Sequence, residues 1–340
     1  MSNNEIMIRC EGLTKVYDEL QALVNLNLSI PRGHVFGYIG HNGAGKTTTI
    51  RILAGLLKPS SGEAWIADAR VGPERDRIKQ LVGYMPDSFG VYDQMRVWEY
   101  LDFFGAAFKI PKGPRRARME EVLDITEAAY MRDRFVDTLS KGMKQRVGIA
   151  RTLMHDPAVL LLDEPANGLD PQARVEMRVL LRKLANAGKT ILVSSHILPE
   201  LAQMSDSIGI IHQGHLKAAG LINDVLSQLQ RDRLLEVKLL SQAPAAAEML
   251  KANKRISKLD ETDMDIARAL RFRFSGDDEA MAALLADLMV AKLPVVSLRE
   301  VPLSLEDAYM SISGIGEDSE DDAEAALAGS SKASSAATAR

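Results

Sequence analysis

Short apolar runs alternate with amphipathic segments over roughly the first two thirds of the chain. Short runs rich in apolar and β-branched residues at Val35–Ile39, Val159–Leu162 and Thr190–Ser194 are typical of strands buried on both faces. Each run leads into a helical or loop pattern that is marked by glycine or proline. Such alternation predicts a mainly parallel sheet covered by helices between about Ile6 and Gly220.

A helical pattern occupies Val97–Arg151, which contains almost no strand signal. Within it, the segment Pro111-Lys112-Gly113-Pro114 predicts a break between helices, because proline and glycine interrupt helical backbone. The basic stretch Lys109–Arg118 around that break has two interpretations, a solvated loop or a surface for anionic lipid headgroups. We favour the solvated loop, because runs of like charge are usually solvated.

A second module follows at about Asp232–Ser313. Its expected order is strand, helix, strand, strand, helix, strand, which is typical of a small ferredoxin-like α+β sandwich. These elements are Leu234–Leu240, Ala243–Lys251, Arg255–Leu259, Ala269–Phe274, Asp278–Ala291 and Pro294–Val301, with a closing helix at Ser304–Ile312. The chain beyond them is mainly alanine, serine, glycine and acidic residues, which bury too little apolar surface to fold. We therefore expect residues 1–225 to form one domain with a helical subdomain at about 88–151, residues 226–313 a second domain, and residues 314–340 a disordered tail.

The chain has 340 residues and a net charge of −4, and its tail accounts for the acidic excess. From Gly316 onward there are six acidic and two basic residues, so the remainder is neutral. A neutral body argues against sequence-independent nucleic-acid binding, which needs a basic surface. The only cysteine, Cys10, excludes a disulfide framework and favours a reducing, cytoplasmic setting. We find neither a secretory pattern nor an apolar stretch of about 20 residues that would cross a bilayer.

A phosphate-binding motif follows the first of the buried apolar runs. Gly40-His41-Asn42-Gly43-Ala44-Gly45-Lys46-Thr47 fits G-x-x-x-x-G-K-[ST] and lies between a predicted strand and a predicted helix. Its glycines allow successive backbone N–H groups to converge on phosphate oxygens, and the helix presents its positive end to the same anion. We expect Lys46 to reach the terminal phosphates and the Thr47 hydroxyl to bind Mg²⁺. The candidate nucleotide-binding residues here are Gly40, His41, Asn42, Gly43, Ala44, Gly45, Lys46, Thr47 and Thr48.

Two carboxylates follow the second buried run, at Asp163 and Glu164. A buried strand that ends in a carboxylate delivers charge to the edge of the sheet where such folds bind ligands. Alone, two acids after a strand are more often a solvated strand end than a catalytic pair. The upstream phosphate motif reverses those odds. We expect Asp163 to hold Mg²⁺ and Glu164 to accept a proton from the attacking water.

With these elements in place, further segments resemble the ATP-binding-cassette (ABC) ATPases. Leu139-Ser140-Lys141-Gly142-Met143-Lys144-Gln145-Arg146 resembles the signature sequence of that family, and Ala166–Asp170 resembles its D-loop. Tyr17 resembles the aromatic residue that stacks on adenine, and His196 resembles the switch histidine that contacts the γ-phosphate. The motifs occur in the family's order over about Ile6–Gly220, and together they are specific.

The resemblance implies an α/β P-loop ATPase domain with an antiparallel β subdomain and a helical insert, followed by the small α+β module. It implies the cofactors ATP and Mg²⁺, with Glu164, His196 and Lys46 as catalytic residues. Members of the family pack head to tail around two ATP molecules, so Ser140 and the N–H groups near Gly142 would meet the γ-phosphate bound to a second copy. Asp170 of the D-loop is a further candidate nucleotide-binding residue. We expect a homodimer, with a heterodimer as the alternative.

Two positions depart from the common family pattern. Asp87 stands where the family usually has a glutamine, and we expect it to bind Mg²⁺ or position water. The signature reads Ser-Lys-Gly-Met in place of the commoner Ser-Gly-Gly-Gln. Similar substitutions resemble ABC-2-type and drug-resistance-like exporter ATPases, which often end in a phrase like Ser304–Tyr309. We expect hydrolysis to be retained.

The leading hypothesis is the ATPase subunit of a transporter, peripheral on the inner face of the cell membrane through a separately encoded transmembrane permease. Phe89–Asp93 lies where family members receive that permease, and the alternative is that its aromatic residues only pack the helical insert. Two rival functions remain: a soluble ABC ATPase that acts on nucleic acid or ribosomes, and a slow or non-hydrolysing regulatory clamp. The neutral body and the single phosphate motif weigh against nucleic acid.

Overall fold

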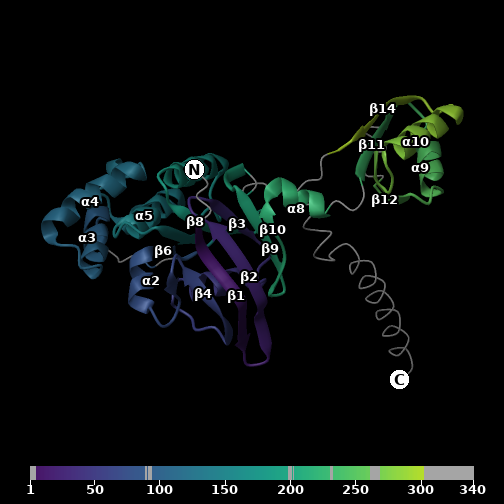
Figure 1. Ribbon diagram of the computed structural model, residues 1–340. Coiled ribbons are helices and arrows are strands. Elements are labelled where there is room, and N and C mark those ends of the chain that lie inside the picture. The colour runs from purple at the N-terminus through teal and green to yellow at the C-terminus, as the bar shows by residue number, and fades with distance from the viewer. Residues whose placement is uncertain are drawn as a thin grey trace, which may run out of the picture. The chain divides into compact units, whose positions relative to one another are not determined.

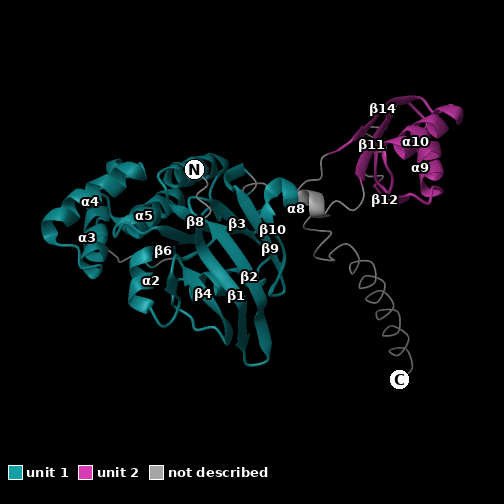
Figure 2. Cartoon of the chain, viewed as in Figure 1, with its two compact units in different colours: residues 1–225 teal, residues 226–340 magenta. Residues whose placement is uncertain are grey.

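The computed structural model describes residues 5–88, 90, 94–197, 201, 203–229, 233–260 and 269–301 (Figure 1). The chain divides into two compact units, unit 1 at Met1–Val225 and unit 2 at Leu226–Arg340 (Figure 2). The closing helix predicted at 304–312, the tail, and Phe89 and Tyr92 of the expected permease contact lie outside the described residues. Within the described ranges, no helix combines the length and the apolar character that a bilayer crossing requires.

The central sheet of unit 1 contains β3 (Val35–Ile39), β6 (Val82–Met85), β7 (Val159–Leu162), β8 (Thr190–Ser195), β9 (Ser207–His212) and β10 (His215–Leu221). Its order is β10-β9-β3-β8-β7-β6, with only the β10–β9 pair antiparallel among the described strands. The residues of β3, β7 and β8 are all buried, which confirms the prediction from their apolar and β-branched runs. The carboxyl ends of these three parallel strands meet at one edge of the sheet, where the candidate site lies.

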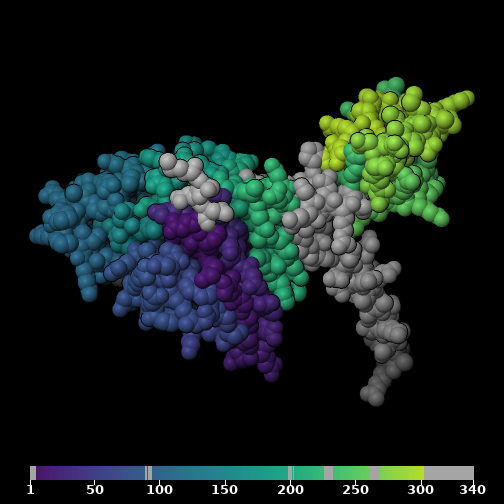
Figure 3. Space-filling view, viewed as in Figure 1, coloured from purple at the N-terminus to yellow at the C-terminus, as the bar shows by residue number. Residues whose placement is uncertain are grey.

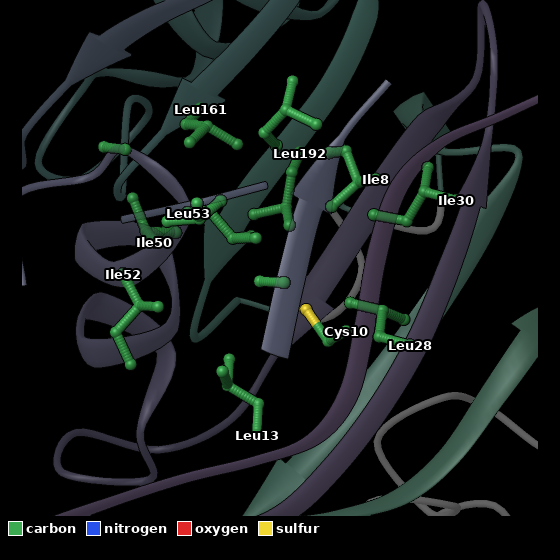
Figure 4. Close-up of a cluster of buried hydrophobic side chains, with 14 of the residues drawn as sticks. Ile8, Cys10, Leu13, Leu28, Ile30, Ile50, Ile52, Leu53, Leu161 and Leu192 are labelled. Atoms are coloured by element: carbon green, nitrogen blue, oxygen red, sulfur yellow. The ribbon is translucent and has the colours of Figure 1, made fainter. Parts of the chain in front are cut away.

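A second, antiparallel sheet packs beside α1 (Lys46–Leu53). It contains β1 (Ile6–Tyr17), β2 (Leu20–Pro31), β4 (Ser61–Ile66) and β5 (Ala69–Arg70), in the order β2-β1-β4-β5. Figure 4 shows their shared core, in which side chains of β1, β2 and α1 meet Leu161 and Leu192 of the central sheet. The sulfur of Cys10 lies inside this core, and burial raises the pKa of the Cys10 thiol to about 12. In the space-filling view, β1 and β2 form a purple band between the blue and green segments of unit 1 (Figure 3).

The helical insert contains α3 (Val97–Ala107), α4 (Lys112–Ile125) and α5 (Lys141–Leu153), with two 3₁₀ turns, η1 (Ala129–Met131) and η2 (Val136–Thr138). Further helices in the described part of the chain are α2 (Arg75–Leu81), α6 (Pro171–Asn186) and α8 (Ile222–Leu229), which spans the boundary at Val225. The break between α3 and α4 lies earlier than the sequence predicts, because Lys112, Gly113 and Pro114 already belong to α4. The first turn of a helix tolerates proline, since its N–H groups have no partner within the helix.

The prediction of a solvated loop at Lys109–Arg118 is wrong, because most of this stretch is helical. The Nε of Arg115 donates to Asp102 of α3 at 2.6 Å. The Nη2 of Arg118 donates to the carbonyl of Leu153 at 2.6 Å and to Asp156 at 3.1 Å. These two arginines tie α4 to both of the other helices, a role that a run of like charges does not reveal.

Unit 2 contains β11 (Arg233–Leu239), α9 (Ala243–Lys251), β12 (Ile256–Asp260), β13 (Ala269–Phe274), α10 (Asp278–Val290) and β14 (Val295–Glu300). The described strands form an antiparallel sheet in the order β12-β13-β11-β14. This confirms the predicted strand-helix-strand-strand-helix-strand succession and its ferredoxin-like arrangement. Apolar side chains of α9 and α10 pack with the inward positions of the strands, including Leu235, Val237, Leu270, Phe272 and Phe274.

His155, just after α5, gives a pH-dependent prediction. Its Nε2–H donates to the Val82 carbonyl at 3.0 Å, and its ring stacks on Phe108 with centroids 3.8 Å apart. Its Nδ1 is buried and, among the described residues, has no hydrogen-bond partner. Burial lowers the pKa of His155, so below about pH 6.5 the unfolded chain binds the proton more readily than the folded one.

We therefore expect the stability of the protein to fall as the pH drops from about 7.5 to about 5.5, partly through His155. His155→Phe keeps an aromatic ring on Phe108 but cannot titrate, so its melting temperature should fall less over that range. The exposed His215 supplies the control, and His215→Gln should retain the wild-type pH dependence. Equal pH dependence in wild type and His155→Phe would contradict this account.

Candidate functional site

The phosphate motif forms a tight loop between β3 and α1, as the sequence predicts. Gly45 has φ +111°, and a Cβ there would come within 2.6 Å of the Ala22 carbonyl oxygen. At Gly40 a Cβ would come within 2.6 Å of the Ile211 carbonyl oxygen. Only glycine fits these two positions, because the loop is pressed between β2 and the end of β9. The N-terminus of α1 consequently points into the space above the sheet edge.

Lys46, Glu164 and His196 form a chain of polar contacts beside this loop. The Nζ of Lys46 donates to the carbonyl oxygens of Gly40 and His41, and lies 3.2 Å from the Glu164 carboxylate. The other oxygen of Glu164 lies 2.8 Å from Nδ1 of His196. Both Lys46 and Glu164 are less than a tenth exposed, so these contacts are largely shielded from water. Glu164 also has φ +50°, a rare conformation that the surrounding contacts hold in place.

Asp163 is fixed by two hydroxyl groups. The Ser194 hydroxyl donates to the Asp163 carboxylate at 2.8 Å and accepts the backbone N–H of Glu164 at 3.0 Å. Burial raises the pKa of Asp163, and the hydrogen bonds from Ser194 and Thr47 partly oppose that rise. A desolvated carboxylate next to a hydroxyl is thus held beside the phosphate loop.

A cavity of about 460 Å³ opens over the loop and these carboxylates. Its lining includes Asp87 at the end of β6 and Asn167, whose side-chain amide donates to Asp87 at 3.3 Å. The predicted residues that line it are His41, Asn42, Gly43, Gly45, Lys46, Thr47, Thr48, Asp87, Glu164 and His196. Gly40 and Ala44 belong to the same loop, and Asp163 directly precedes Glu164, but none of these three residues is part of the lining.

Tyr17 lies at the end of β1 and is 40% exposed. The Nζ of Lys15 lies 4.9 Å from its ring centroid, close enough for a cation–π contact. Tyr17 does not line the cavity over the phosphate loop.

The predicted signature residues lie in a different cavity, of about 300 Å³. Ser140 is the N-cap of α5 and accepts the Met143 N–H at 3.4 Å. Asp170 caps α6 in the same way, accepting the Ala173 N–H at 2.8 Å. Gly142 lines the cavity with both. Within one chain, therefore, the structure does not bring Ser140, Gly142 and Asp170 to the phosphate loop.

Comparison with known proteins decides the family. Residues 23–167 match the family model described as ABC transporter. The Nod factor export ATP-binding protein I of Ralstonia nicotianae is 32% identical over 91% of this chain and 94% of its own length. The linearmycin resistance ATP-binding protein LnrL of Bacillus subtilis is 29% identical over 91% of this chain and 98% of its own length. The bacitracin transport ATP-binding protein BcrA of Bacillus licheniformis is 41% identical over 62% of this chain and 68% of its own length.

The chain belongs to the ABC transporter ATP-binding proteins. It is the ATP-binding subunit of a transporter and an ATPase, because hydrolysis of ATP is the activity by which this family powers transport. The solved structures agree. A structure described as the ATP-binding subunit of an ABC transporter is 29% identical, with a TM-score of 0.59 over 65% of this chain and 92% of its own. The structure of cbiO1 from Clostridium perfringens is 28% identical, with a TM-score of 0.59, and the match covers 66% of this chain and 95% of cbiO1.

Sequence reasoning missed two polar residues of this ABC ATPase site. Ser194 bonds both to Asp163 and to the backbone of Glu164, and Asn167 bonds to Asp87. A signal was present for each, since Ser194 directly precedes the Ser195-His196 pair and Asn167 lies inside the D-loop. Their partners are far away in sequence, so only the fold shows what these side chains hold.

Proposed function

We propose that Lys46 and the backbone N–H groups of the phosphate loop bind the triphosphate of ATP in the larger cavity, while Tyr17 stacks on the adenine. One observation carries the proposal: inside that cavity, a buried carboxylate lies between the lysine of the phosphate loop and a histidine, 3.2 and 2.8 Å away. The positive end of α1 and the ammonium group of Lys46 both favour a polyanion there. Tyr17 retains enough exposed ring for stacking.

Glu164 is the proposed general base for hydrolysis. A water molecule attacks the γ-phosphorus, the bond to the bridging oxygen breaks, and Glu164 takes the proton of the water, leaving ADP and inorganic phosphate. His196 orients the Glu164 carboxylate through the 2.8 Å contact, and its ring lines the cavity in which it would contact the γ-phosphate. Ser194 fixes the backbone of Glu164, while Lys46 and His196 hold its side chain beside the loop.

The donor set beside the phosphate loop suits Mg²⁺. Thr47 and Asp163 offer a hydroxyl and a carboxylate joined by a hydrogen bond, with Asp87 nearby as a further oxygen donor. The described residues hold no group of three or more His, Cys, Asp or Glu side chains that could bind a metal alone. Mg²⁺ is commonly held by one or two carboxylates together with substrate phosphates, which matches the donor set of Thr47, Asp163 and Asp87. Bound there, the ion would neutralise charge that develops on the phosphates.

A second copy of the chain is the proposed source of the remaining contacts. Ser140, Gly142 and Asp170 line a cavity of their own, apart from the phosphate loop of the same chain. A head-to-tail dimer would place the N-cap of α5 over the γ-phosphate bound to the other copy, where the positive end of that helix favours an anion. We propose a homodimer, with a heterodimer as the alternative.

The partner beyond the dimer is a separate membrane permease, to which we propose the chain binds on the inner face of the cell membrane. The direction we propose is export. This rests on the names of relatives, which describe Nod factor export, bacitracin transport and linearmycin resistance. The cargo is decided by the permease and not by the residues of this chain.

The experiment that tests the proposal measures dimer formation with neutralised Glu164. In the presence of ATP and Mg²⁺, Glu164→Gln should pass from monomer to dimer in analytical ultracentrifugation, because hydrolysis no longer removes the bridging nucleotide. Adding Ser140→Arg should abolish that dimer while ATP binding persists, since only the contact to the other copy's nucleotide is blocked. A dimer that forms equally well with Ser140→Arg, or none with saturating ATP, would refute the proposed arrangement.

A further inference from the structure

The sheet of unit 2 has one face covered by its helices and one face that they leave open. The two helices α9 and α10 lie side by side against the sheet (Figure 1), and their apolar residues pack with Leu235, Val237, Phe272 and Phe274. Alternate residues along each strand point the other way. That opposite face, which we call the open face, carries polar and charged side chains.

The open face is rich in cations. Lys238 of β11, Arg271 and Arg273 of β13, and Arg299 of β14 alternate with the inward core residues of their strands. The carboxylates that face them from the described strands are Glu236, in the centre, and Asp260, opposite Arg271 at the end of β12. Among the described residues of these strands, four cations therefore lie beside two carboxylates, so the described part of this face is positive.

Glu236 holds two of these cations in place, and both of its carboxylate oxygens are engaged in the contacts. Its two oxygens accept Nε of Arg271 at 2.9 Å and Nη2 of Arg299 at 2.6 Å, and the Glu236 side chain is only 8% exposed. These contacts lower the pKa of Glu236, so it stays charged. The Arg271 and Arg299 side chains nevertheless remain 46% and 66% exposed. Glu236, Arg271 and Arg299 together thus present two oriented guanidinium groups on the open face.

The chain itself contains a matching polyanion. Residues 302–331 include no lysine, arginine or histidine, and six acids crowd into one short stretch of them: Glu317, Asp318, Glu320, Asp321, Asp322 and Glu324. We call residues 317–324 the acidic segment. It follows β14, an edge strand of the same sheet that itself carries Arg299. Sixteen extended residues can span roughly 50 Å, so the segment can reach any point of the open face.

We propose that the acidic segment of this chain binds the open face of unit 2, with its carboxylates over Lys238, Arg271, Arg273 and Arg299. We favour the acidic segment over a separate polyanion because the segment is covalently connected to the sheet. Exposed ion pairs are individually weak, and a face with so small an excess of positive charge would hold a free polyanion poorly. A tethered segment is present at an effective concentration of about 1 mM, which is enough for a weak contact to form. This contact lies outside the nucleotide chemistry and would keep other anions from the face.

The test uses the full-length chain with two fluorophores. Cys10 is 2% exposed, so Ser257→Cys on β12 and Ser319→Cys in the acidic segment can be labelled selectively in the folded protein. We expect efficient energy transfer at about 50 mM NaCl, falling by about half or more at about 500 mM, because salt screens exposed charges. Charge reversal with Lys238→Glu and Arg273→Glu should produce the same loss at low salt. Both residues lie outside the contacts that hold Glu236, which protects the fold.

The matched control reverses two charges elsewhere in unit 2, with Lys254→Glu and Lys292→Glu. Both lysines are exposed in turns away from the open face, so energy transfer should be unchanged. Circular dichroism checks that each variant is folded. Equal energy transfer in the face and control variants would overturn the proposal. So would transfer that disappears when labelled protein is diluted into excess unlabelled protein, because the contact would then join two copies.

Discussion

Replacement of Glu164 by glutamine should lower the rate of ATP hydrolysis by about 100-fold or more while ATP still binds. Glutamine has nearly the shape of glutamate but cannot take the proton of the attacking water. The buried position of Glu164 between Lys46 and His196 leaves no described carboxylate equally placed to replace it. Steady-state phosphate release measures the loss, and equilibrium binding of a fluorescent ATP analogue checks that the site is intact.

The control for this experiment is Glu248→Gln, which removes an exposed carboxylate of α9 and should leave hydrolysis at the wild-type rate. A variant that binds ATP but hydrolyses it within about threefold of the wild-type rate would show that Glu164 is not the base. It would also revive the interpretation as a regulatory clamp if wild type itself hydrolysed no faster than Glu164→Gln.

Removal of the Lys46 side chain should instead act on binding. We expect Lys46→Ala to weaken ATP affinity by about 10-fold to 150-fold, since a hydrogen bond to a charged group contributes about 1.5–3 kcal/mol. The loss arises because the Lys46 ammonium group is 5% exposed and would contact the phosphates without competition from water. Isothermal titration calorimetry with ATP and Mg²⁺ measures it.

Two further variants make the Lys46 result interpretable. The exposed Lys58→Ala, just beyond α1, should bind ATP as wild type does. Lys46→Arg keeps the positive charge but changes its geometry, and should recover only part of the affinity. If Lys46→Ala melts at the wild-type temperature and binds ATP equally well, then Lys46 does not hold the triphosphate.

The sequence predicted local features of this ATPase more successfully than contacts between distant segments. The phosphate loop was predictable because the close approaches at Gly40 and Gly45 require glycine, and that requirement is written in consecutive residues. The strands ending at Ile39 and Leu162 were predictable because both of their faces are buried. Roles that depend on two distant segments, such as that of Ser194 beside Glu164, leave almost no mark on a single sequence.

The helical insert likewise contains contacts that the sequence pattern did not predict. A charge run around Arg115 and Arg118 has the composition of a solvated loop, yet each arginine has a partner 13 or 35 residues away. Helix propensity and proline placement gave two helices here, but the break between them moved because Pro111 is the N-cap of α4. Pairing across helices is decided by packing, which pattern and composition do not encode.

The clamp that Arg118 makes on the end of α5 has a mechanical consequence. Arg118 grips the carbonyl of Leu153 at one end of this helix, and Ser140 caps the other. Thirteen residues of helix form a stiff rod about 20 Å long. A rotation of the helix by about 10° about Leu153 would move Ser140 by about 3 Å, which is enough to make or break a contact with a phosphate. In the proposed dimer, a small movement of the outer helices would thereby become a larger movement of Ser140 at the nucleotide of the other copy.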